Sequence, residues 1–163
     1  DLAFEDLHDP WGLAFWPNFK GRDGCRTPMP WHHDVPHGGF TEAERPWLPV
    51  PPAHLARAVD LQDRDPSSVL NTVRAFLNWR RERTALRTGS IEFLRGQEDA
   101  DLLVFMRVND ADHLVCLFNL SDQARRWQAP GPLLDAGFLS EGAEVAAREV
   151  ALPPWGFAFA HLE

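Results

Sequence analysis

The residues with the greatest chemical potential lie between Gly21 and Trp31, in the run GRDGCRTPMPW. Arg22 and Arg26 are four residues apart, with Asp23 between them, in a loop that also holds Gly and Pro. A guanidinium presents a planar fork of donors that fits a carboxylate or two adjacent sugar hydroxyl groups. Neighbouring aromatic side chains suit the apolar face of a pyranose ring. The alternative is a structural Arg–Asp network that pins the loop, and ion-pair networks are commoner than binding sites.

A second group of chemically active side chains follows at once, with His32, His33 and Asp34 in a row and His37 nearby. Such residues invite a metal site. Their spacing matches no compact ligand motif, however, and adjacent histidines usually point in different directions. We therefore predict solvated loop histidines. The sequence predicts neither a bound metal nor any other cofactor.

Residues that could catalyse a reaction by themselves are not evident. The serines lack a nucleophile-elbow context such as G-x-S-x-G. Cys25 is flanked by arginines that could make it reactive, but no positioned histidine accompanies it. Each acid has a simpler role as a cap, in a turn or on a solvated face, so no catalytic residue is assigned. The acids considered are Glu42, Glu44, Asp60, Asp63, Asp65, Asp99 and Asp101.

The composition is that of an acidic globular chain. Its 163 residues are 44% hydrophobic, with 11 Phe and 7 Trp, which is enough for a core in about one domain. The net charge of −8 argues against nucleic-acid binding, which needs clustered Lys and Arg. No apolar run reaches the roughly 18 residues needed to span a membrane. We expect Cys116, in an apolar run, to be a reduced core residue in a cytoplasmic protein.

Two kinds of segment precede the strands. Residues 1–62 hold most of the Pro and Trp and show no sustained hydrophobic period, which predicts an ordered, irregular loop packed on other structure. Residues 63–88 are predicted to contain one amphipathic helix over 66–86, capped by Asp65 and ended near Gly89. Its apolar stripe comprises Val69, Leu70, Val73, Phe76 and Leu77.

Residues 89–163 change to the period of β-strands. The runs 102–108 and 114–120 are apolar, and the turn cluster at 109–112 between them predicts a hairpin. Turn residues separate the strands at intervals typical of a small antiparallel sandwich. The predicted fold class is therefore mainly β, a C-terminal Greek-key-like sandwich after one helix and a long irregular loop. The other predicted strands are 91–95, 124–128, 133–138, 144–151 and 155–161.

The run Gly21–Trp31 resembles the α-glucosidase and oligo-1,6-glucosidase branch of glycoside hydrolase family 13, the α-amylase family. Two satellites follow in the family's order, GGFT at 38–41 and PWL at 46–48. The preceding FWPNFK at 15–20 looks like the bacterial subgroup that acts on short α-glucosides, and LPPWGF at 152–157 is like the family's final strand. The resemblance covers nearly the whole chain.

Enzymes of this family have a (β/α)8 barrel followed by an antiparallel β domain. The resemblance implies that residues 1–62 are the loop after the last barrel strand, on the active-site face. It implies that residues 63–88 are the last barrel helix and that residues 89–163 are the C-terminal β-sandwich. The family's Asp nucleophile, Glu acid/base and stabilising Asp come from earlier strands. The chain would then be the C-terminal part of a retaining α-glucosidase, inactive alone.

The resemblance also implies a role for one arginine. In exo-acting members, an Arg of this loop pairs with an early barrel Asp and grips the glucose at the non-reducing end. Arg26 is the first candidate for this substrate-binding role and Arg22 the second.

Three functional hypotheses remain open. The first is the C-terminal part of an α-glucosidase, whose partner would be a short α-glucoside and whose exposed loop could mediate self-association. The second is a free-standing β-sandwich module that binds carbohydrate or protein through exposed aromatic residues. The third is a non-catalytic relative that acts as an interaction partner. The Arg26 loop favours the first, because a free-standing module has little use for a barrel-docking segment.

Overall fold

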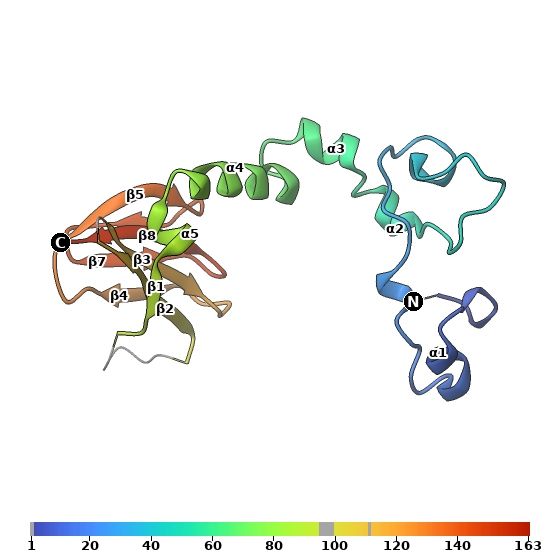
Figure 1. Cartoon of the computed structure of the whole chain (residues 1–163), viewed down its shortest axis with the longest axis horizontal. Helices are drawn as coiled ribbons and strands as arrows, with labels where there is room; N and C mark the ends of the chain where they lie inside the picture. Colours follow the sequence, from blue (N-terminus) through green and yellow to red (C-terminus); the bar gives the residue numbers. More distant parts are fainter. Residues whose placement is uncertain (1, 95–99, 111) are drawn as a thin grey trace. The chain divides into compact units, whose positions relative to one another are not determined.

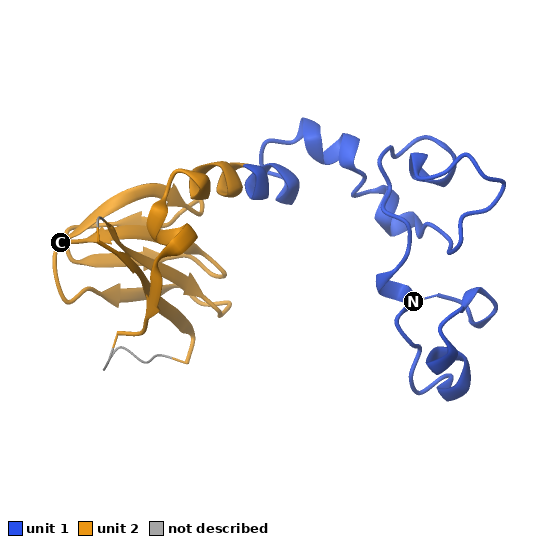
Figure 2. Cartoon of the chain, in the orientation of Figure 1, with its two compact units in different colours: residues 1–74 blue, residues 75–163 orange. Residues whose placement is uncertain are grey.

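The computed structural model describes residues 2–94, 100–110 and 112–163, and the chain divides into two compact units (Figure 1 and Figure 2). Unit 1 comprises residues 1–74 and unit 2 residues 75–163. Helix α4 (Val69–Arg81) contributes residues to both. No helix in the described ranges is both long enough and apolar enough to cross a membrane.

Unit 1 consists of short helices joined by irregular backbone. Proline occupies the first position of α1 and of α2, where its fixed φ fits a helix and no hydrogen bond is lost. Each helix before α4 is too short to show a hydrophobic period, so the sequence pattern of residues 1–62 predicted none of them. These elements are η1 (Phe4–Asp6), α1 (Pro10–Phe15), η2 (Asp23–Cys25), η3 (Pro36–Gly39), α2 (Pro52–Leu55) and α3 (Val59–Arg64).

The helix predicted over 66–86 begins later than the sequence suggested. Asp65 does not cap it, because its Oδ1 accepts hydrogen bonds from the backbone and hydroxyl of Ser67 in a turn, at 2.9 and 2.7 Å. Ser68 caps α4 instead. Its Oγ accepts the backbone N–H of Asn71 at 3.2 Å, which satisfies one of the free donors of the first turn.

The predicted helix is also divided in two. Arg83 has extended backbone and separates α4 from α5 (Thr84–Thr88). The C-terminal part of α4 packs through Trp79, which donates from Nε1 to the carbonyl of Ala136 at 3.1 Å. The same indole lies 5.2 Å from the ring of Phe138 and 4.9 Å from that of Phe159, centroid to centroid. This aromatic layer attaches α4 to the sheet of unit 2.

Unit 2 is a sandwich of two antiparallel sheets, which confirms the predicted fold class. The larger sheet has the strand order β1-β2-β3-β8-β5 and the smaller one β4-β7-β6. The strands are β1 (Ser90–Glu92), β2 (Leu102–Asn109), β3 (Asp112–Asn119), β4 (Arg125–Gln128), β5 (Leu133–Leu139), β6 (Glu144–Val145), β7 (Glu149–Leu152) and β8 (Phe157–Leu162).

The predicted strands 124–128, 133–138 and 155–161 correspond to β4, β5 and β8. Two further predictions concern how the strands pair. The hairpin is confirmed, because β2 pairs with β3 and Asn109 lies opposite Asp112. The predicted strand 144–151 is instead two short strands, β6 and β7, which pair with Val145 opposite Val150. Residue 95, at the end of the predicted strand 91–95, and residue 111, in the hairpin turn, lie outside the described residues.

Strand β3 is buried on both faces. Val115 and Leu117 belong to the core between the two sheets, whereas Leu114 and Cys116 belong to a second cluster with the residues of α5. All four side chains are at most 1% exposed. A strand covered on both faces carries a continuous apolar run rather than a strict alternation, and this is the pattern at 114–117.

Candidate functional site

Two buried aspartates lie beneath the arginines of the Gly21–Trp31 loop. Asp9 and Asp23 are only 2% and 1% exposed. Oδ2 of Asp23 accepts the backbone N–H groups of His8, at 2.6 Å, and of Asp9, at 2.7 Å. A buried carboxylate is stable only where donors replace its lost water, and here the main chain supplies them. The loop is thereby fastened to residues 8–9.

Asp9 connects helix α1 to the loop. Its Oδ1 caps α1 by accepting the backbone N–H of Trp11 at 3.1 Å. Its Oδ2 accepts two hydrogen bonds from Arg22, one from the backbone N–H at 3.0 Å and one from Nε at 2.9 Å. The hydrogen bond from the Arg22 side chain is the main reason that the pKa of Asp9 falls to about 2, although burial opposes the shift.

Arg22 is held at its Nε and exposed beyond it. Its side chain is 58% exposed, and the hydrogen bond to Asp9 raises the pKa of its guanidinium. Within the described part of the chain, its two terminal Nη groups make no hydrogen bond. The ion pair therefore fixes the orientation of Arg22 while leaving the outer half of its donor fork available to a ligand.

Arg26 lies above the same two carboxylates at a longer distance. Its Nη1 is 3.9 Å from Oδ2 of Asp9 and 4.0 Å from Oδ1 of Asp23, and its side chain is 41% exposed. That Oδ1 atom is buried and has no hydrogen-bond partner among the described residues. Arg26 is thus held by charge rather than by a hydrogen bond. The sequence left two alternatives open, a structural Arg–Asp network and a guanidinium available to a ligand. The structure contains both features in the same loop.

Two glycines permit the close approach that positions Arg22. Gly21 has φ +73°, a conformation that side chains other than glycine rarely adopt. A Cβ atom at Gly12 would lie 2.7 Å from the backbone oxygen of Lys20, and one at Gly21 would lie 3.0 Å from Cβ of Asp9. The DPWG and GRD segments therefore pack backbone against backbone. This contact brings Asp9 within hydrogen-bonding distance of Arg22.

The surface of unit 1 is rich in exposed aromatic side chains. Trp11 and Phe15 stack with an interplanar angle of 8° and a centroid distance of 5.5 Å, yet both are more than half exposed. Exposed aromatic surface of this extent suits a ligand or another folded segment. The aromatic residues concerned are Phe4, Trp11, Phe15, Trp16, Phe19, Trp31, Phe40 and Trp47.

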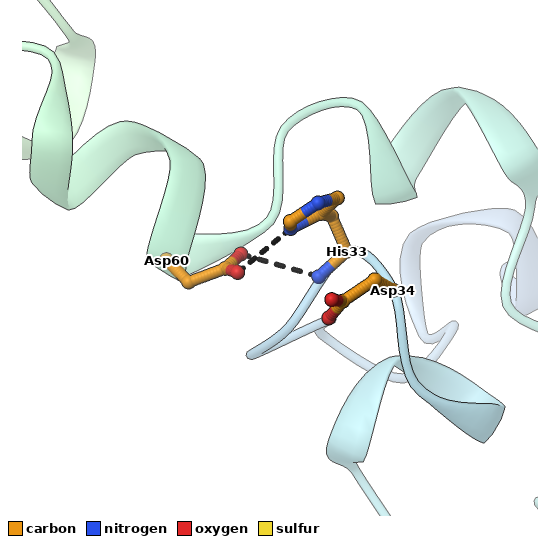
Figure 3. Close-up of side chains that lie close together, drawn as sticks. All are labelled: His33, Asp34 and Asp60. Atoms are coloured by element: carbon orange, nitrogen blue, oxygen red, sulfur yellow. Dashed lines mark hydrogen bonds and ion pairs between the residues drawn. The ribbon is translucent and has the colours of Figure 1, made fainter.

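The structure adds Asp60 to the histidine group. Nδ1 of His33 lies 2.7 Å from Oδ2 of Asp60, and the backbone N–H of His33 donates to Oδ1 at 3.2 Å (Figure 3). Asp34 lies beside this pair, and among the described residues His37 does not join it. Burial alone would raise the pKa of Asp60, but the hydrogen bonds from His33 lower it. Sequence reasoning missed Asp60 because it is 27 residues away.

The two cysteines have different environments. Cys25 is exposed, and its Sγ donates to the carbonyl of Arg22 at 3.0 Å. Cys116 is free and buried in β3, as predicted, and burial raises the pKa of its thiol to about 12. Cys25 therefore supports the loop backbone at Arg22, whereas Cys116 is a packing residue.

Comparison with known proteins assigns both parts of the chain to described families. Residues 5–89 match the family model for the catalytic domain of alpha amylase. Residues 91–159 match a domain of unknown function, DUF3459.

Similar proteins act on or transfer glucosyl groups, according to their names. The probable alpha-glucosidase of Rhizobium meliloti (strain 1021) is 47% identical over 166 residues, which cover 99% of this chain and 29% of that protein. The probable oligo-1,6-glucosidase 2 of Bacillus subtilis (strain 168) is 35% identical over 128 residues, covering 78% of this chain and 22% of that protein. A solved structure, the alpha-glucosyl transfer enzyme XgtA, is 40% identical with a TM-score of 0.88, covering 100% of this chain and 30% of that one. The chain thus spans less than a third of the length of each.

Proposed function

Because the chain belongs to the α-amylase family of glycoside hydrolases (family 13), we propose that the whole protein is a retaining α-glucosidase. It releases or transfers glucose from the non-reducing end of short α-glucosides. The names of the similar proteins support both outcomes, since they include glucosidases and a glucosyl transfer enzyme. A retaining mechanism passes through a glucosyl-enzyme intermediate, which either water or a second sugar can resolve.

In this proposal the chain supplies one wall of the glucose pocket. Residues 1–62 are the loop after the last barrel strand, residues 63–88 the last barrel helix and residues 89–163 the C-terminal sandwich. The two buried acids of the site, Asp9 and Asp23, accept hydrogen bonds that hold the loop. They are therefore unsuited to attack a sugar. The catalytic carboxylates come from outside these 163 residues, and the chain alone is inactive.

The observation that carries the proposal is the exposure of two guanidinium groups above buried carboxylates. Arg26 is the first candidate for binding the terminal glucose, because its fork makes no hydrogen bond to the described residues and can reorganise around hydroxyl groups. Arg22 is the second candidate and has a fixed Nε. A guanidinium that closes the far end of the pocket restricts cleavage to single glucosyl units.

The test uses the full-length protein and an aryl α-glucoside as substrate. We expect Arg26→Ala to lower kcat/KM by about 10²-fold, the scale of losing a positioning charge. Arg64→Ala, at an exposed arginine of α3 in the same unit, is the control and should leave kcat/KM unchanged. A rate near that of the wild type for Arg26→Ala would assign Arg26 to structure. Glucose release by the 163-residue chain alone would disprove its inactivity.

The alternative of a carbohydrate- or protein-binding sandwich module rests on Trp155. This residue is 66% exposed and has φ +57°, which is unusual for a bulky side chain. Its backbone N–H donates to the carbonyl of Ser121 at 3.0 Å, so the turn holds the indole at the surface of unit 2. Maltotriose binding by the chain, abolished in Trp155→Ala and retained in Arg26→Ala, would favour the module.

The partner expected for the chain by itself is a second copy of the same chain. The exposed aromatic residues of unit 1 support it, because apolar surface of this kind associates in water. Sedimentation of the 163-residue chain should therefore show dimers or larger species, and removal of residues 1–62 should yield monomers. The same oligomeric state for both chains would contradict this expectation.

A further inference from the structure

One cluster of ligand-type side chains lies outside the Gly21–Trp31 loop. We infer that His33, Asp34 and Asp60 form a binding site for a divalent transition-metal ion of the zinc type. One ligand atom from each residue lies within 4.8 Å of the other two (Figure 3). The site joins the loop after Trp31 to the first turn of helix α3.

The distances suit an ion of this size. Zinc binds imidazole nitrogen and carboxylate oxygen at about 2.1 Å, so two ligands of a tetrahedral ion are about 3.4 Å apart. Nδ1 of His33 and Oδ2 of Asp60 are now 2.7 Å apart, with a proton between them. Replacing that proton by the ion requires this pair to separate by less than about 1 Å. The carboxylate of Asp34, whose ligand atom lies within 4.8 Å of the other two, has to approach by at most about 1.4 Å.

His32 can supply a fourth ligand. Its Nδ1 lies 4.0 Å from Oδ2 of Asp60, and its side chain is 59% exposed and so able to reorient. Imidazole nitrogen and carboxylate oxygen are both ligands that zinc accepts. Calcium and magnesium instead prefer sites made of oxygen ligands alone.

The backbone holds the two halves of the site together. The N–H groups of Val59 and Asp60 donate to the carbonyls of Pro30 and Trp31, at 3.1 and 3.0 Å. The side chain of Asp60 is only 13% exposed, so it is restrained where it meets His33. These contacts fix the distance between loop and helix without any help from the cluster. An ion would therefore meet a loop and a helix that are already held together, which lowers the entropic cost of binding.

Calorimetric titration of zinc chloride into the metal-free 163-residue chain tests the site. We expect one ion per chain, and Asp60→Asn should weaken zinc binding by about tenfold or more. Asparagine keeps an oxygen that can accept the backbone N–H of His33, so this variant should fold. His33→Gln is a second variant with the same expected result. His37→Asn is the matched control and should bind as the wild type, because asparagine tolerates the φ of 54° found there.

The visible absorption of bound cobalt(II) provides a second readout. If the His33–Asp60 pair had only a structural role, disrupting it would not change this absorption. Cobalt(II) bound in the wild type should show the intense visible absorption of a tetrahedral site, and Asp60→Asn should lose it. The inference is overturned if the chain takes up no zinc. It is also overturned if Asp60→Asn and His33→Gln, folded by circular dichroism, bind zinc as tightly as the wild type.

Discussion

Arg22 donates from its backbone N–H and from its Nε to one and the same oxygen, Oδ2 of the buried Asp9, at 3.0 and 2.9 Å. A single carboxylate oxygen thus fixes both the main chain and the guanidinium of a residue 13 positions away. The other oxygen of Asp9 caps helix α1. Asp9 is therefore the residue through which a short helix sets the position of a candidate sugar-binding arginine.

The first prediction concerns this pair. Asp9→Asn and Arg22→Gln should each lower the urea midpoint of unit 1, because each removes the same charge-assisted hydrogen bond. The double variant should then lower the urea midpoint by less than the sum of the decreases in the two single variants. Urea unfolding, monitored by tryptophan fluorescence, of the wild type and the three variants provides this double-mutant cycle. Arg64→Gln is a control for the loss of an arginine. Strictly additive losses would show that the pair is not coupled.

The second prediction concerns acid. The pKa of Asp9 is about 2 in the folded chain, against a reference value of 3.8 for the unfolded one. A carboxyl whose pKa is lowered by folding stabilises the fold above its unfolded pKa. This contribution is therefore complete above pH 3.8 and is lost as the pH falls through about 2. Unfolding midpoints measured across this window should fall more steeply for the wild type than for Asp9→Asn. Parallel profiles would contradict the assignment.

The third prediction concerns the two thiols. Cys25 is exposed and Cys116 is buried with its thiol pKa raised to about 12, so only Cys25 should react with a thiol reagent near neutral pH. The folded chain should release one equivalent of chromophore from a disulfide reagent and the unfolded chain two. Cys25→Ser should react only after unfolding. Rapid labelling of Cys116 in the folded chain would show that the α5-covered face of β3 opens readily.

The fourth prediction concerns the sandwich core. Leu117 is fully buried between the two sheets, so Leu117→Ala should lower the free energy of unfolding by about 2–5 kcal/mol. Leu134, in β5, is 56% exposed, and Leu134→Ala should change the same free energy by about 0.5 kcal/mol or less. Denaturant unfolding of both variants provides the comparison. A small loss for Leu117→Ala would mean that the sheets close over the cavity.

The sandwich could be predicted from sequence because its signals are local. The apolar run at 102–108, the polar turn after Asn109 and the turn residues between later strands are each signals that act over a few positions. The ends of the helix predicted over 66–86 were predicted less reliably than its existence. Asp65 and Ser68 both have the chemistry of a cap, and only the hydrogen bond from Asn71 to Ser68 shows which one begins α4.

By itself, the sequence determined the mainly β fold class, the hairpin of β2 and β3, the buried state of Cys116 and the chemical character of the Arg22–Arg26 loop. These properties follow from side-chain type and short-range period. Tertiary structure alone decided that Asp9 binds Arg22 across 13 residues and that Asp60 meets His33 across 27. Such pairs depend on the path of an irregular backbone through close glycine contacts and isolated main-chain hydrogen bonds, and no hydrophobic period encodes that path.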